Sequence, residues 1–305
     1  MIFTIFTPAY NRANTLTQLY NSLKVQTIND FEWVVVDDGS TDKTEEIVNS
    51  FIIEGVLNIK YIKQNNGGKH RAINKGLDVA KGELFFIVDS DDYLLPNSLE
   101  IILKYYSDIK GDAAYIGVTG FRGFENGQVI GGKFFPNQIT DSNLIERREK
   151  YKVTADLAHV LKTELFRKFY FPDINGEKFV AESIVWNRMS IEYKMRYFNE
   201  IIYIGEYLEG GLSSNSIKNR QKNSQYSTLL YKELVYNPNT KLRLKIKSLI
   251  NYWRFAFCRP TSLENKFSFI EVNFLSIITM PIGYLYYLKD CWNNTIKVQK
   301  INNER

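Results

Sequence analysis

The sequence predicts an α/β fold with a mostly parallel, doubly wound sheet. Up to Pro96, short apolar segments rich in β-forming residues alternate with segments whose apolar residues recur at helical spacing. The connections between these segments are short, which favours parallel strands with helices packed on the sheet. With 305 residues, the chain can hold one large domain, or one domain and an extension.

The elements of this first part follow from the pattern of apolar residues. A strand from Ile2 to Thr7 precedes a helix in which Leu16, Leu19 and Leu23 recur at helical spacing. Leu84 to Val88 is an uninterrupted apolar run, typical of a strand buried on both faces. The other expected elements are a strand at 31–36, a helix at 43–51, a strand at 59–63 and a helix at 70–80.

The chain after Pro96 predicts further elements and then changes in character. We expect a helix at 98–106, a strand at 113–119, a hairpin over the Gly-rich 120–136, a strand running into a short helix at 156–168, a helix through Trp186 and a strand at 197–204. The expected boundaries are therefore a catalytic domain at 1–215 and a basic, aromatic-rich helical extension at 216–305.

The extension contains one long apolar stretch, Phe274 to Leu288, interrupted by Pro281 and Gly283. It is shorter than the roughly 20 residues that a membrane-spanning helix needs. An interfacial segment, or a helical hairpin packed on the catalytic domain, fits this length better. Because Lys and Arg accumulate after Lys218, contact with an anionic membrane surface is one interpretation, and simple core packing is the other.

Composition excludes some classes and favours a cytoplasmic protein. No nucleic-acid-binding motif accompanies the net charge of +5, so nucleic acid is not an expected partner. The two cysteines, Cys258 and Cys291, form neither a disulfide framework nor a metal-binding spacing. Since the chain begins with an apolar strand and not with a signal peptide, we expect it in the cytoplasm, with the inner face of the cell membrane as a further location.

Polar loops follow each of the first four expected strands, at 7–12, 37–42, 65–69 and 89–92. The carboxyl ends of parallel strands open into one crevice, so these loops are expected to meet there. The fourth loop contains Asp89, Ser90, Asp91 and Asp92, and three adjacent carboxylates call for a positive partner. A divalent cation with a phosphate-bearing ligand is the simplest one, while a solvated loop with Asp92 capping a helix is the alternative.

The loops suit a nucleotide that serves as a leaving group. There is no Gly-rich P-loop and no Gly-x-Gly-x-x-Gly after the first strand. Asp38 could accept a hydrogen bond from a base N–H, Lys69 could reach a phosphate or a base carbonyl, and Asp91 could bind a metal that bridges two phosphates. Taken singly, Asp38 as a helix cap and Lys69 as a solvated charge are the better explanations. Their position together at one end of the sheet favours ligand binding instead.

Four motifs resemble the family-two inverting glycosyltransferases of the GT-A fold, of the bacterial surface-polysaccharide type. They are TPAYNR, VVVDDGSTDKT, NNGGKHRAINKGLDVAKGE and FFIVDSDDYLLP, in this order. The resemblance, which extends over residues 1–215, implies a Rossmann-like sheet flanked by helices and transfer of a hexosyl or N-acetylhexosaminyl group. It implies a nucleotide-diphosphate sugar as donor, with UDP favoured, and a hydroxyl of a glycan or lipid-linked glycan as acceptor.

The resemblance also implies roles for individual residues. Thr7, Pro8 and Tyr10 would line the nucleotide pocket, and Asp38 would contact the base. Lys69 would lie near the base and the diphosphate. Asp89, Ser90 and Asp91 match the family's Asp-x-Asp motif, in which Asp89 contacts the donor and Asp91 binds Mn²⁺ or Mg²⁺. Gly210 to Ser213 resembles a loop that closes over the donor, although a plain turn also explains its glycines.

The general base is expected at Glu182. An inverting transfer needs one base to take the proton of the acceptor hydroxyl. In the family this base is an acidic residue at a helix start, followed by an aromatic residue and an arginine. AESIVWNR, from Ala181 to Arg188, matches that pattern with Glu182, although the usual Asp is replaced. A residue that only stabilises the helix N-terminus is the alternative for Glu182.

Three further interpretations remain. The two histidines, His70 and His159, are expected to have packing roles, although His70 could also reach a phosphate. A sugar-nucleotide pyrophosphorylase is an alternative enzyme, but it would need a Gly-rich loop with Arg and Lys near the N-terminus. A non-catalytic nucleotide-sugar-binding subunit of a glycan assembly complex is an alternative of another class, and it predicts that the carboxylates are lost.

Overall fold

The computed structural model describes residues 1–205, 216–271 and 273–303, without the side chains of 294–303. The expected donor-closing loop at 210–213 lies outside these residues. The chain forms two compact units. The first holds Met1–Asp173 and the chain from Ala181 to the first gap, and the second holds Ile174–Val180 and the part described after residue 215.

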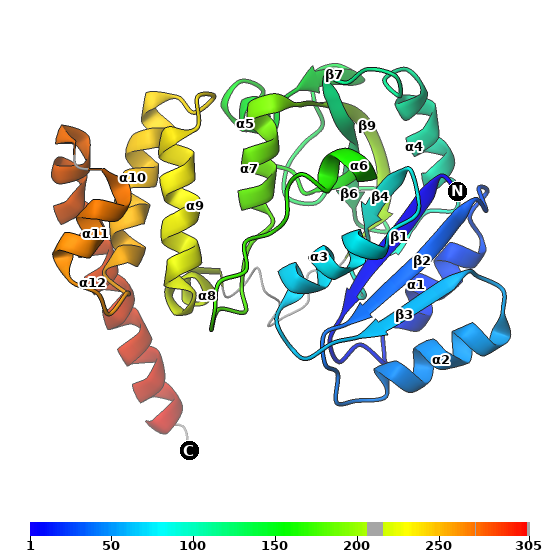
Figure 1. Cartoon of the computed structure of the whole chain (residues 1–305), viewed down its shortest axis with the longest axis horizontal. Helices are drawn as coiled ribbons and strands as arrows, with labels where there is room; N and C mark the ends of the chain where they lie inside the picture. Colours follow the sequence, from blue (N-terminus) through cyan, green and yellow to red (C-terminus); the bar gives the residue numbers. More distant parts are fainter. Residues whose placement is uncertain (206–215, 272, 304–305) are drawn as a thin grey trace. The chain divides into compact units, whose positions relative to one another are not determined.

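The first unit is built on a mixed sheet of nine strands in the described residues (Figure 1). The order along the sheet is β3-β2-β1-β4-β8-β6-β9-β5, and β7 pairs with β9. The strands are β1 (Phe3–Ala9), β2 (Phe31–Asp37), β3 (Ile59–Lys63), β4 (Leu84–Ile87), β5 (Tyr93–Leu94), β6 (Tyr115–Gly123), β7 (Ile139–Ser142), β8 (Leu157–Lys162) and β9 (Lys194–Ile204).

The first four strands are parallel and confirm the predicted fold class. Phe3, for example, lies beside Phe31 of β2 and Leu84 of β4. The sheet continues with antiparallel β8 and with β6, which is antiparallel to β8 and parallel to β9. The carboxyl ends of β1 to β4 consequently open at one edge, where the four polar loops begin.

Helices cover both faces of the sheet, as the doubly wound pattern requires. In the first unit they are α1 (Leu16–Lys24), α2 (Thr44–Glu54), α3 (Lys69–Val79), α4 (Ser98–Ser107), α5 (Leu144–Glu149), α6 (Thr163–Phe166) and α7 (Ser183–Glu192). Phe3 and Ile5 of β1 share one core with apolar residues of α1, α2 and α4. Phe6 points to the other face, against Gly76 of α3.

The hairpin expected at 120–136 forms only in part. Strand β6 ends at Gly123, and a turn through Gly127, with a φ of 79°, leads back to Val129. The returning arm makes one isolated bridge, between Gly123 and Val129, and no strand. Gly131 then takes a φ of 75°, which turns the backbone out of an extended course.

The second unit contains five helices in its described part: α8 (Ser216–Lys222), α9 (Ser224–Tyr236), α10 (Leu242–Ala256), α11 (Leu263–Ile270) and α12 (Phe274–Asn303). Of the two alternatives for Phe274–Leu288, the helical hairpin is wrong, because α12 runs through Pro281 and Gly283 without a break. Pro281 is exposed, and Gly283 is packed against α10, so neither residue needs a turn there. Within the described residues, no helix is long and apolar enough to cross a membrane.

Gly76 sets the distance between α3 and the sheet, and α3 begins at Lys69. A Cβ on Gly76 would lie 2.1 Å from Cε2 of Phe6, which is fully buried. We therefore expect Gly76→Ala to destabilise the protein by about 1–2 kcal/mol, because overpacking outweighs the better helix propensity of alanine. The measurement is the thermal unfolding midpoint. Gly111→Ala, whose Cβ meets no atom within 4 Å, is the control, and equal midpoints would contradict the prediction.

Candidate active site

Four loops at the carboxyl ends of β1 to β4 are joined to one another by hydrogen bonds and ion pairs. The N–H of Asn11, in the first loop, donates to Ser40 Oγ at 2.9 Å in the second. Asn11 Oδ1 in turn accepts from the N–H of Thr41 at 2.9 Å. Asn11 has a φ of 53°, which asparagine tolerates better than most residues. The convergence that the sheet order predicted is therefore present in the structure.

Asp38 fixes the third loop against the second. One of its carboxylate oxygens accepts from Gln64 Nε2 and from the N–H of Gly67, both at 2.8 Å. The other accepts from the N–H of Gly68 at 2.7 Å and from Asn66 Nδ2 at 3.3 Å. These donors fill the roughly four acceptor positions of a carboxylate. A contact between Asp38 and a base would have to replace one of these hydrogen bonds.

Lys69 joins the third loop, the fourth loop and the start of α7. Its Nζ lies 2.6 Å from Asp89 Oδ1 and 2.8 Å from Glu182 Oε1. All three side chains are partly buried, with exposed fractions of 20–29%. Burial alone would lower the pKa of Lys69, but the two carboxylates raise it above its ordinary value. Three residues predicted for the site from separate parts of the sequence thus form one ion-paired group.

Arg122 of β6 is a member of this group that the sequence reasoning missed. Its Nη1 lies 3.2 Å from Asp89 Oδ2 and 3.5 Å from Asp92 Oδ2, and its guanidinium lies 4.1 Å from the ring centre of Tyr203. Burial alone would raise the pKa of Asp89, but Lys69 and Arg122 hold it well below its usual range. The available signal was a lone arginine within the otherwise Gly-rich and apolar segment after residue 115.

Asp92 belongs to the buried side of the group. Its carboxylate accepts from the Tyr203 hydroxyl at 2.7 Å, and that hydroxyl accepts from the N–H of Asp89 at 2.8 Å. Burial and the neighbouring charge of Asp89 raise the pKa of Asp92 to about 6. The N–H of Asp92 closes a turn by donating to the carbonyl of Asp89 at 3.2 Å, but Asp92 does not cap the next helix, because α4 begins at Ser98 after Asn97.

Asp91 is the carboxylate of the fourth loop with the weakest protein contact. Its Oδ2 lies 3.7 Å from Nη2 of Arg12, and a quarter of its side chain is exposed. No group of three His, Cys, Asp or Glu side chains within the described ranges could hold a metal alone. Mg²⁺ typically takes one or two carboxylates and completes its shell with phosphate oxygens and water. Asp91 therefore fits a metal that is bound jointly with a diphosphate.

The remaining predicted donor-binding residues differ in exposure. Thr7 is fully buried, and its hydroxyl accepts from Trp33 Nε1 at 2.9 Å. Ser90 is also buried, whereas Pro8 is half-buried and Tyr10 is exposed. Pro8 and Tyr10 can therefore offer their side chains to a ligand directly. Thr7 and Ser90 could reach one only through the backbone or after a local movement.

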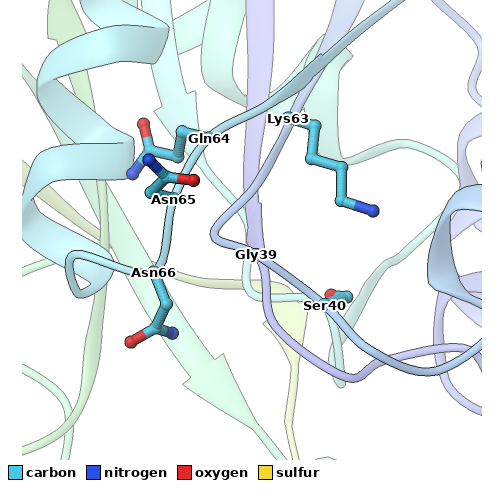
Figure 2. A pocket seen from close by; sticks show the side chains of 6 residues that line it. All are labelled: Gly39, Ser40, Lys63, Gln64, Asn65 and Asn66. Atoms are coloured by element: carbon cyan, nitrogen blue, oxygen red, sulfur yellow. The ribbon is translucent and has the colours of Figure 1, made fainter.

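An open pocket of about 540 Å³ lies at the ends of β2 and β3. Gly39 and Ser40 line it from the second loop. Figure 2 shows Gln64 and Asn65 on one side of the pocket and Lys63 on the other. The lining is polar and includes the neighbour of Asp38, but none of the carboxylates of the fourth loop. The pocket is therefore formed by the second and third loops, and the ion-paired group does not line it.

The two histidines are buried and are not poised for acid–base chemistry. His70 is 1% exposed, neither of its ring nitrogens has a hydrogen-bond partner among the described residues, and burial lowers its pKa to about 4. His159 contacts Thr119 Oγ1 at 2.8 Å and packs on the edge of Trp186. Burial and the charges of Arg147 and Arg122 lower the pKa of His159 to about 3. The expected packing roles agree with these surroundings.

His70 should make the stability of the protein depend on pH. Its folded pKa of about 4 lies below the ordinary value of 6.5, so its contribution is complete above pH 6.5 and is lost as the pH falls toward 4. Relative to His70→Leu, the wild type should lose about 2–3 kcal/mol of unfolding free energy between pH 7.5 and pH 4.5. Urea unfolding at several pH values measures this, and a pH-independent difference would contradict it.

Comparison with known proteins identifies relatives of the chain. Residues 4–169 match the family model described as glycosyl transferase family 2. The glycosyltransferase GlyG of Streptococcus pneumoniae is 26% identical over 69% of this chain and 72% of its own length. The poly(ribitol-phosphate) beta-N-acetylglucosaminyltransferase TarS of Staphylococcus aureus is 31% identical over 70% of this chain, but over only 38% of TarS.

Solved structures agree in fold. Residues 1–349 of S. aureus TarS in complex with UDP-GlcNAc match with a TM-score of 0.64 and 23% identity, covering 93% of this chain and 79% of that one. A mannosyltransferase from Pyrobaculum calidifontis in complex with GDP-Man and Mn²⁺ matches with a TM-score of 0.56 and 16% identity, covering 96% and 86%. The family model matches more than half of the residues of this chain, and the chain therefore belongs to glycosyl transferase family 2.

Proposed function

We propose that the chain is a metal-dependent inverting glycosyltransferase of polysaccharide biosynthesis. It moves a hexosyl or N-acetylhexosaminyl group from a nucleotide-diphosphate sugar to a hydroxyl of a glycan or lipid-linked glycan. The observation that carries the proposal is the bridge from Lys69 to both Asp89 and Glu182. The ammonium group of Lys69 lies between Asp89, the carboxylate proposed to contact the donor, and Glu182, the carboxylate proposed as general base.

The proposed reaction is a single displacement at the anomeric carbon. The acceptor hydroxyl oxygen forms a bond to that carbon while Glu182 takes its proton, and the bond from the carbon to the diphosphate oxygen breaks. The electron pair of that bond leaves with the nucleoside diphosphate. Lys69 Nζ contacts Glu182 Oε1 at 2.8 Å and so holds this carboxylate in place at the start of α7.

The donor-binding residues are proposed as a set. Pro8 and Tyr10 flank the nucleotide, with Thr7 beneath them. Asp38 helps to bind the nucleobase. It does so through the 64–68 loop that it holds, or by exchanging one of its hydrogen bonds for one with the nucleobase. Asp89 faces the sugar, Ser90 contributes through its backbone, and Lys69 reaches the diphosphate. Asp91 would hold Mn²⁺ or Mg²⁺, which when bound neutralises charge on the departing diphosphate. UDP is the favoured nucleotide, and the UDP-GlcNAc in the TarS structure supports this choice.

The acceptor and the location are proposed from the relatives and from charge. TarS is named for poly(ribitol-phosphate), and a chondroitin synthase of Pasteurella multocida is 29% identical over 72% of this chain and 22% of its own length. Both names support a polymeric acceptor. We propose a cytoplasmic location, at the inner face of the cell membrane. Screening a panel of nucleotide sugars for hydrolysis with Mn²⁺ tests the function directly, and no turnover of any donor would favour a non-catalytic binding subunit.

Removing the charge of Asp91 should weaken metal binding and turnover together. Asp91→Asn is expected to lower metal-dependent donor turnover by about two orders of magnitude or more, because the protein ligand of the cation is lost. Calorimetric titration of Mn²⁺ in the presence of UDP should show the same loss of affinity. Asp108→Asn, at an exposed carboxylate on the surface, is the control. Unchanged Mn²⁺ affinity in Asp91→Asn would refute the metal assignment.

Glu182→Gln should separate donor binding from transfer. Glutamine keeps the size of the side chain and can still accept from Lys69, but it cannot take a proton. We expect donor affinity within about threefold of wild type and transfer reduced by about 10²- to 10⁴-fold. Glu192→Gln, at the exposed end of the same helix, is the matched control. If Glu182→Gln retained full transfer, the base would have to lie elsewhere.

A further inference from the structure

Helix α12 in the second unit carries a wide apolar face that nothing in the described structure covers. Phe274, Leu285 and Trp292 are 75%, 64% and 70% exposed. Ile278, Ile282 and Leu288 are exposed on the same side. At 100° per residue, the exposed apolar side chains between Phe274 and Trp292 cover about 200° of the helix and a length of about 27 Å. An exposed apolar surface of this extent is typical of an interaction site.

The opposite face of α12 is packed on α10, which fixes the direction of the exposed face. Trp253 Nε1 donates to the carbonyl of Ser276 at 2.7 Å. Arg254 forms two hydrogen bonds with Asp290, at 2.6 and 2.7 Å. A Cβ on Gly283 would lie 2.4 Å from Cβ of Trp253, so the two helices are in close contact there. The free face cannot turn inward without breaking this packing.

Charge around the face indicates what it meets. Between Phe274 and Trp292 the charged residues are Lys289 and Asp290, and Asp290 is paired with Arg254 on the inner side. Lys289 is exposed within the apolar face. After residue 209 the sequence has 15 of its 39 Lys and Arg but only 5 of its 34 Asp and Glu. This part of the chain is therefore strongly basic and complementary to an anionic surface.

We infer that the outward face of α12 lies in the headgroup region of an anionic lipid bilayer, parallel to its plane. Apolar side chains would enter the acyl boundary, and Trp292 with Tyr284 and Tyr286 would occupy the interface that such rings favour. Lys289 would extend its ammonium group to the headgroups. This inference deepens the proposed location by naming the residues that carry it, and it rests on the second unit alone.

A second copy of the chain explains the face less well. A contact between two helices uses an apolar stripe of roughly 100°, about half the width seen here. Two basic units would also repel each other, and Lys289 would be buried against apolar side chains. A membrane surface covers a wide face, attracts the positive charge and leaves Lys289 hydrated.

The test is binding of the full chain to sedimented vesicles. We expect binding to phosphatidylcholine vesicles that contain about one-third phosphatidylglycerol, and weaker binding to pure phosphatidylcholine or at high salt. The double variant Leu285→Glu and Trp292→Glu should bind the anionic vesicles at least about tenfold more weakly. The matched control is Ile53→Glu and Val56→Glu, two exposed apolar residues of the first unit with the same change in charge.

A second measurement reports on the position of Trp292. Of the other three tryptophans, Trp33 and Trp253 are fully buried, and Trp186 is half-buried and lies in the first unit, away from α12 in the chain. Lipids brominated in their acyl chains should therefore quench mainly Trp292 in the wild type. Trp292→Phe should bind similarly and lose most of that quenching. UDP binding, measured in parallel, keeps a failure of this inference apart from a failure of the proposed transferase activity.

Two outcomes would overturn the inference. In one, the α12 variant binds vesicles as well as the wild type, or the wild type does not bind anionic vesicles. In the other, light scattering shows a stable dimer that dissociates in the double variant. The face would then be an interface between copies of the chain.

Discussion

The ion-paired group around Lys69 is the constraint on which the rest of the site depends. Two carboxylates that contact one ammonium group, with Arg122 on the far side of Asp89, balance charges that would otherwise repel each other in a partly buried place. Removing either Lys69 or Arg122 would leave Asp89 with a single positive partner. The elements that bring these residues together, α3, β4, β6 and α7, are thereby fixed relative to one another at this edge.

Asp38 joins the second and third loops by hydrogen bonds, just as Lys69 joins the carboxylates by ion pairs. Its carboxylate satisfies two backbone N–H groups and two amide side chains, so the 64–68 segment is ordered before any ligand arrives. Gly68 can take its φ of 100° there because it lacks a Cβ. A preorganised loop loses less conformational freedom on binding, which favours affinity for a donor. Asp38, which the resemblance places in contact with the nucleobase, thus also has a structural role, because it orders this loop.

Helix α12 presents different residues to two surfaces. Gly283 and Asp290 face α10, where close contact and a paired charge are needed. Phe274, Leu285 and Trp292 face outward, where no partner is present in the described chain. A helix that is apolar on its free side and anchored on the other is suited to hold a folded unit at a surface, and it does not need the length of a spanning helix.

The sequence by itself determined the first four strands, their helices and the convergence of four polar loops, because apolar periodicity and short connections leave few topologies open. It also indicated Lys69, Asp89, Asp91 and Glu182, although their catalytic roles stay predictions. Only the tertiary structure decided that Lys69 bridges Asp89 and Glu182, that Arg122 joins them, and that α12 is one continuous helix with a free apolar face. These features depend on contacts between residues far apart in the chain and on which side of a helix is covered. The local sequence determines neither.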